Sequence, residues 1–137
     1  MKISDNILKN IKIPLKRWWP TTLTLLVVLY ATLWPDPVGA DNVMLFPYAD
    51  KLIHAIMMGG LSSAILFDYR RSGKKITINT CFIVSLIMII FSLLDETGQY
   101  VMGLGRSFEL LDLAADTGGV ILGIILSRPV INKIFEK

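Results

Sequence analysis

The stretch ITINTCFIVSLIMIIFSLL, residues 76–94, decides which fold this sequence can adopt. It carries no charged residue, and apolar and polar residues do not alternate along it as they would in a membrane-spanning strand. A transmembrane α-helix needs about 17–25 predominantly apolar residues, and this stretch supplies them. The stretch therefore predicts a helix that lies in lipid.

Three further apolar runs accompany it, at residues 18–34, 52–67 and 110–126. Trp18, Trp19 and Trp34 mark the two ends of the first run, as aromatic residues at a membrane interface do. Only 18% of the residues are charged, against about 25% in an average soluble domain. We therefore expect an all-α polytopic membrane protein, a compact bundle of four transmembrane helices. The expected organisation is a basic N-terminal segment (1–17), the transmembrane domain (18–126) and a short tail (127–137).

The basic residues predict the orientation of the bundle. Twelve of the fourteen lysines and arginines lie in residues 2–17, 70–75 and 128–137, which would share one side of the membrane. The positive-inside rule makes that side cytoplasmic, with both termini inside, in the inner (cytoplasmic) membrane. The alternative is a cleaved signal peptide that ends near VGA, residues 38–40. The tryptophans at both ends of the first run, together with Pro35 and Pro37, favour a retained helix.

Polar residues gather where three of the runs meet the opposite, outer side. They are Asp50, Lys51 and His54 before and within the second run, Asp95, Glu96 and Gln99 after the third, and Arg106, Asp112 and Asp116 around the start of the fourth. Ionisable groups within spans are costly and usually face a cavity or one another. We therefore expect these side chains to converge. Farther along the fourth run, Ala115, Gly119 and Gly123 form a stripe of small residues that predicts close helix packing.

Four motifs occur here in a fixed order: DKLIH (50–54), DETGQ (95–99), GRSFELLD (105–112) and AADTGGVILG (114–123). Together they resemble the motifs of VanZ-like membrane proteins, with a core over residues 50–123. The resemblance implies a small bundle of bacterial membrane helices, and the family's namesake is associated with resistance to the lipoglycopeptide teicoplanin. This chain differs by Asp116, where the family often has asparagine, and by AIMM after His54 in place of aromatic residues.

The predicted function is to bind or modify an envelope amphiphile or its head group, with membrane lipids or a lipid-linked envelope component as partner and no nucleic acid. The candidate catalytic residues are His54 as general base, with Asp95 or Glu96 setting its tautomer. The candidate substrate-binding residues are Asp50, Lys51, Gln99, Arg106, Asp112 and Asp116. Lys51 and Arg106 would hold a phosphate or carboxylate. Since Cys81 is mid-span and the motifs offer no supported serine nucleophile, a covalent mechanism is not expected.

No cofactor is expected in the main hypothesis, but two alternatives stay open. In the first alternative, a divalent metal is held by His54 and the nearby carboxylates in a metal-assisted hydrolase or transferase. In the second, the polar residues only join the helices of a structural protein. A binder or enzyme predicts a cavity open toward the outer leaflet, whereas a scaffold predicts side chains that satisfy one another without a void.

Overall fold

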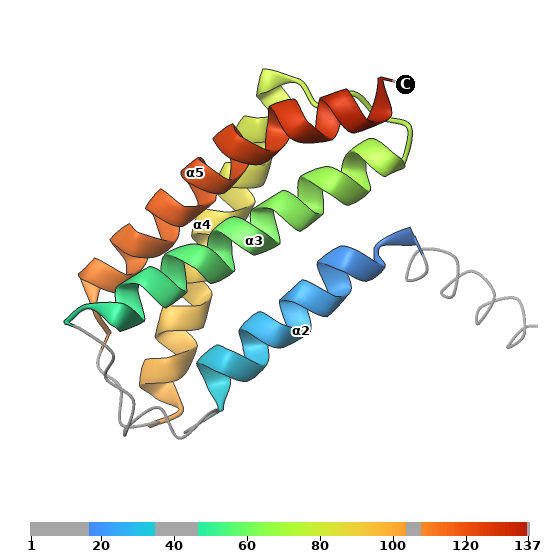
Figure 1. The fold of residues 1–137 in the computed structure, drawn as a ribbon. Coiled ribbons are helices and arrows are strands. Elements are labelled where there is room, and N and C mark those ends of the chain that lie inside the picture. The colour runs from blue at the N-terminus through green and yellow to red at the C-terminus, as the bar shows by residue number, and fades with distance from the viewer. Residues whose placement is uncertain (1–16, 35–46, 104–107, 137) are drawn as a thin grey trace, which may run out of the picture.

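The computed structural model describes residues 17–34, 47–103 and 108–136, and in these ranges every regular element is a helix (Figure 1). The elements are α2 (Trp19–Leu33), α3 (Ala49–Arg71), α4 (Ile78–Val101) and α5 (Leu110–Phe135). Within the described residues there is no strand. The predicted all-α fold class is confirmed.

Three of these helices are long and apolar enough to cross a membrane. They are α3, α4 and α5, with 23, 24 and 26 residues. The chain is therefore a multi-pass membrane protein. The first predicted span appears as the apolar helix α2, which has 15 residues. At 1.5 Å per residue it is about 22 Å long, shorter than the hydrocarbon core of about 30 Å.

The helices end later than the apolar runs that predicted them. Helix α3 continues past residue 67 to Arg71, α4 past residue 94 to Val101, and α5 past residue 126 to Phe135. Hydropathy marks where a helix leaves lipid, but the backbone hydrogen bonds of the helix continue through polar residues. At the other boundary, Thr77 caps α4 by accepting a hydrogen bond from the Thr80 backbone N–H at 3.2 Å. Helix α4 therefore begins at Ile78, two residues after the start of the apolar run at residue 76.

Helices α3 and α5 form the centre of the bundle. They begin at the same end and run side by side in the same direction (Figure 1). Helix α2 lies on the other side of α3, while α4 crosses behind and contacts all three of the other helices. This connectivity brings the end of α2, the start of α3, the end of α4 and the start of α5 to one end of the bundle.

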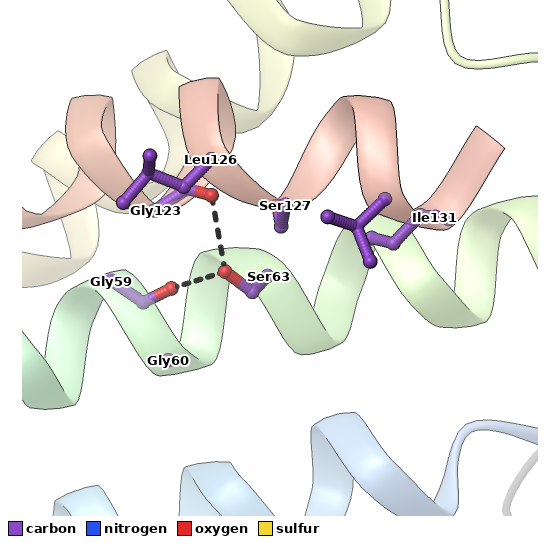
Figure 2. A pocket seen from close by; sticks show the side chains of 8 residues that line it. Gly59, Gly60, Ser63, Gly123, Leu126, Ser127 and Ile131 are labelled. Atoms are coloured by element: carbon purple, nitrogen blue, oxygen red, sulfur yellow. Dashed lines mark hydrogen bonds between the residues drawn. The ribbon is translucent and has the colours of Figure 1, made fainter. Parts of the chain in front are cut away.

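Small residues let α3 and α5 approach closely. A Cβ atom at Gly119 would overlap the backbone of Ala55, and one at Gly123 would overlap the backbone of Gly59. One turn farther, the Ser63 hydroxyl donates to the Gly59 carbonyl at 2.7 Å and to the Gly123 carbonyl on α5 at 3.2 Å (Figure 2). The close packing predicted for Gly119 and Gly123 is confirmed. The stripe on α3 that packs against them has the same four-residue spacing and was not predicted; it consists of Ala55, Gly59 and Ser63.

Basic residues and one buried acid join the helices at the opposite end. The Asp68 carboxylate, fully buried on α3, accepts hydrogen bonds from the Thr21 backbone N–H at 3.0 Å and from the Thr21 hydroxyl at 2.8 Å. It thereby satisfies a free N–H in the first turn of α2. Nearby, Arg17 donates to the Ser72 carbonyl and Arg71 donates to the Arg17 carbonyl.

The positive-inside rule predicts that this basic end faces the cytoplasm. Reporter fusions after residue 73 and at the C-terminus should then report a cytoplasmic location, and a fusion at Gly103 an external one. An external signal from the residue 73 fusion would reverse the orientation and place the polar end described below inside the cell.

Candidate functional site

The polar residues of the three motif-bearing helices meet at the end of the bundle where α3 and α5 begin. They form three neighbouring groups, centred on Asp116, Asp95 and Lys51. Each group joins at least two helices. Polar side chains therefore hold together segments that are far apart in the sequence, in addition to the apolar packing between the helices.

The first group connects three helices through Asp116 on α5. One carboxylate oxygen lies 3.1 Å from Nδ1 of His54 on α3, and the other accepts a short hydrogen bond from the Ser92 hydroxyl on α4. Asp116 has 0% exposure and the His54 side chain is buried. A carboxylate at this depth is tolerable because both oxygens are satisfied, and it holds the imidazole in one orientation.

The second group lies on one face of α4. Ser92, Asp95, Glu96 and Gln99 follow the i, i+3, i+4, i+7 spacing of a single helical face, and all four are buried. Asp95 accepts hydrogen bonds from the Thr32 hydroxyl of α2 at 2.9 Å and from the Gln99 amide at 3.0 Å. Asp95 therefore ties α2 to α4.

The third group surrounds Lys51 at the rim. Its ammonium nitrogen lies 2.8 Å from Asp50, 2.5 Å from Glu109 and 2.6 Å from Asp112. The Asp50 and Glu109 side chains are 62% and 46% exposed, whereas that of Asp112 is 13% exposed. One cation is thus shared by three carboxylates, so the described residues of the rim carry an excess of negative charge.

Glu96 lies between the rim and the buried His54–Asp116 pair. Its side chain is 3% exposed, and its Oε1 atom is 3.9 Å from His54 Nδ1. That oxygen is buried and has no hydrogen-bond partner among the described residues. A buried carboxylate oxygen without a donor is unusual and costly. At this end of the bundle, the described side chains therefore leave Glu96 Oε1 without a hydrogen-bond donor.

The structure thus brings together eight of the nine candidate residues and changes two of the contacts expected for them. Asp116 is the carboxylate hydrogen-bonded to the His54 ring, whereas Glu96 faces the ring at 3.9 Å. Lys51 is held by three acids, so its charge is already balanced without a phosphate. Arg106 lies outside the described residues. The catalytic and binding roles assigned to the eight remain predictions.

Three contributors were not singled out from the sequence: Ser92, Thr32 and Glu109. Ser92 could have been found by extending the helical face of Asp95, Glu96 and Gln99 one turn back into the apolar run. Thr32 gave no comparable signal, because a single threonine in an apolar helix usually bonds its own backbone. Glu109 lies within the GRSFELLD motif (105–112), but nothing in the sequence indicated that it would contact Lys51.

Two hollows that the described residues outline lie away from this end. One follows the α3–α5 groove beside Gly59, Gly123 and Ser127 (Figure 2), and the other lies along α2 beside Trp19 and Leu26. The segments 35–46 and 104–107, which connect the helix ends that carry the polar groups, lie outside the described residues. Neither hollow is lined by the candidate site residues.

The fold and the polar groups define a class: a small helical membrane protein whose ionisable residues gather at one end of the bundle. A family model described as VanZ/LLP1 matches residues 7–132, nearly the whole chain. The chain therefore belongs to the VanZ/LLP1 family, as the four motifs predicted. The comparisons found no matching curated protein and no matching solved structure.

Proposed function

We propose that the polar end of the bundle binds the head group of an amphiphile in the outer leaflet of the cytoplasmic membrane. The observation that carries this proposal is the rim around Lys51. Three carboxylates share one ammonium there, and their exposure falls from Asp50 through Glu109 to Asp112, toward the buried Glu96. The polar groups thus lead from the surface of the bundle into its interior.

The charge of the rim favours a particular kind of head group. With Lys51 already shared, the described part of the rim offers carboxylate oxygens, which accept hydrogen bonds from amines and hydroxyls. An amine-bearing or sugar-like head group fits this arrangement better than a bare phosphate does. The apolar chains of the ligand would lie along the lipid-facing surface of the helices, where Leu52, Ile53 and Leu111 are exposed.

Binding is favoured over covalent catalysis by the state of the possible nucleophiles. The Ser92 hydroxyl is fully buried and donates to Asp116, and Cys81 is buried near the other end of α4. For a proton transfer to or from the bound head group, His54 would be the candidate base, oriented by Asp116.

The test compares the same chemical change at the two ends of the bundle. Protein purified from native membranes should carry an amine- or hydroxyl-bearing lipid enriched over the bulk membrane, as measured by mass spectrometry of extracted lipids. We expect Glu109→Gln to reduce this enrichment several-fold, because it removes an exposed acceptor at the rim. Glu136→Gln, an exposed acid at the opposite end, should leave it unchanged.

Identical lipid profiles in wild type and both variants, each matching the bulk membrane, would contradict the proposal.

The same strains extend the test to antibiotics. We propose that overexpression raises tolerance to a teicoplanin-type lipoglycopeptide more than to a drug with a cytoplasmic target. Equal shifts for the two drugs, measured as inhibitory concentrations, would count against an envelope role.

A further inference from the structure

We propose that His54, Glu96 and Asp112 form a binding site for one divalent transition-metal cation, with zinc and manganese as the best candidates. Each residue offers one ligand atom, and the three atoms all lie within 4.8 Å of one another. One imidazole nitrogen with two carboxylate oxygens suits these cations, whereas magnesium and calcium prefer oxygen ligands alone.

The spacing of the ligand atoms is close to what a bound cation requires. Bonds of about 2.0–2.2 Å place two ligands of one ion no more than about 4 Å apart. His54 Nδ1 and Glu96 Oε1 are 3.9 Å apart, which already falls within that limit. The three residues come from α3, α4 and α5, so a cation would connect the starts of α3 and α5 with the end of α4.

The buried oxygen of Glu96 is an independent indication of a ligand. Oε1 has no hydrogen-bond partner among the described residues, although the side chain is almost fully enclosed. It faces the imidazole across 3.9 Å. A cation between these groups would satisfy the oxygen that the described side chains leave without a donor.

The balance of charge points the same way. The described residues of this end carry one lysine and one histidine against a larger number of acids, namely Asp50, Asp95, Glu96, Glu109, Asp112 and Asp116. Lys51 is in contact with three of the acids at the rim. A divalent cation beside Glu96 would offset the excess in the buried part of the cluster, where solvent does not screen it.

A second set of carboxylates, from Asp50, Glu109 and Asp112, is spaced as closely as the first. The Lys51 ammonium already lies 2.5–2.8 Å from an oxygen of each, so this set has its cation, whereas Asp112 is the one member of the first set in contact with Lys51 among the described residues. We therefore assign the metal to the buried set. Because Asp116 contacts His54 Nδ1, the nitrogen that faces Glu96, a cation bound to that nitrogen would take the place of this hydrogen bond.

The experiment measures metal binding alone and does not require the amphiphile, so this inference and the head-group proposal can fail separately. Tag-free protein in detergent is stripped with a chelator and dialysed against Zn²⁺, Mn²⁺ or Mg²⁺, and the bound metal is counted by mass spectrometry. Wild type should bind one equivalent of Zn²⁺ or Mn²⁺, and Mg²⁺ at least tenfold more weakly.

Variants locate the cation. Glu96→Gln and His54→Gln should each weaken binding at least tenfold, whereas Glu109→Gln and Asp95→Asn should bind within about twofold of wild type. Two results would overturn the assignment: no stoichiometric binding by wild type, or a loss in Glu109→Gln as large as that in Glu96→Gln. If Glu96→Gln proves unfolded by circular dichroism, His54→Gln carries the same comparison.

Discussion

Replacing Gly119 by alanine should cost at least about 3 kcal/mol of folding free energy, at the upper end of overpacking effects. The added methyl would overlap the carbonyl and Cα of Ala55, which are backbone atoms that cannot rotate away. Helices α3 and α5 would have to separate. We expect most of the Gly119→Ala protein to aggregate in detergent, and the remainder to melt well below wild type.

The neighbouring glycine is the matched control. A Cβ atom at Gly118 meets no atom within 4 Å, so Gly118→Ala makes the same change on the same helix without a clash. It should melt at or slightly above the wild-type temperature, because alanine is the better helix former. Equal melting temperatures for the Gly118 and Gly119 variants would show that the two helices are farther apart than described here.

The glycine contact also positions the polar cluster. Ala55 follows His54 directly, and Gly119 lies one turn after Asp116, so the helix separation at the glycine sets the distance between imidazole and carboxylate. A Gly119 variant that is recovered folded should therefore also lose the metal proposed for His54, Glu96 and Asp112.

Asp116→Ala should destabilise the protein by about 3 kcal/mol, in the range found when one member of a buried pair is removed. The substitution leaves the Ser92 hydroxyl and the His54 ring without their shared acceptor in a fully buried place. Asp116→Asn should cost no more than about 1 kcal/mol. The amide oxygen can still accept from Ser92, and its NH₂ group can donate to an unprotonated Nδ1 of His54.

Melting temperatures of the two variants in one detergent decide this. Similar losses in the alanine and asparagine variants would mean that the negative charge of Asp116, and not its hydrogen bonds, holds the helices together.

The sequence was sufficient to predict the helices and the end at which the polar groups meet. Apolar runs locate the helices, and a chain that reverses direction at each connection brings the end of one helix and the start of the next to the same side. What could not be predicted is the rotation of each helix about its axis. That rotation places Asp116, and not Asp95, beside His54, and turns Asp95 toward Thr32.

The small residues illustrate the same limit. Gly119 and Gly123 were recognisable as a packing stripe because their spacing repeats along one helix. Their partners Ala55, Gly59 and Ser63 have that spacing too, but nothing local indicates which stripe a second helix will contact. The pairing depends on how α3 and α5 are rotated about their axes, which only the assembled bundle shows.

If the polar end is arranged for a ligand and not merely for joining helices, the Glu96 carboxylate should add nothing to the folding stability of the metal-free protein. The most direct test is the melting temperature of Glu96→Gln after removal of metal. Because Glu96 Oε1 has no partner among the described residues, removing its charge should leave the melting temperature equal to that of wild type or higher. A fall as large as that of Asp116→Ala would show that Glu96 is a structural member of the network, and would contradict the ligand site proposed here.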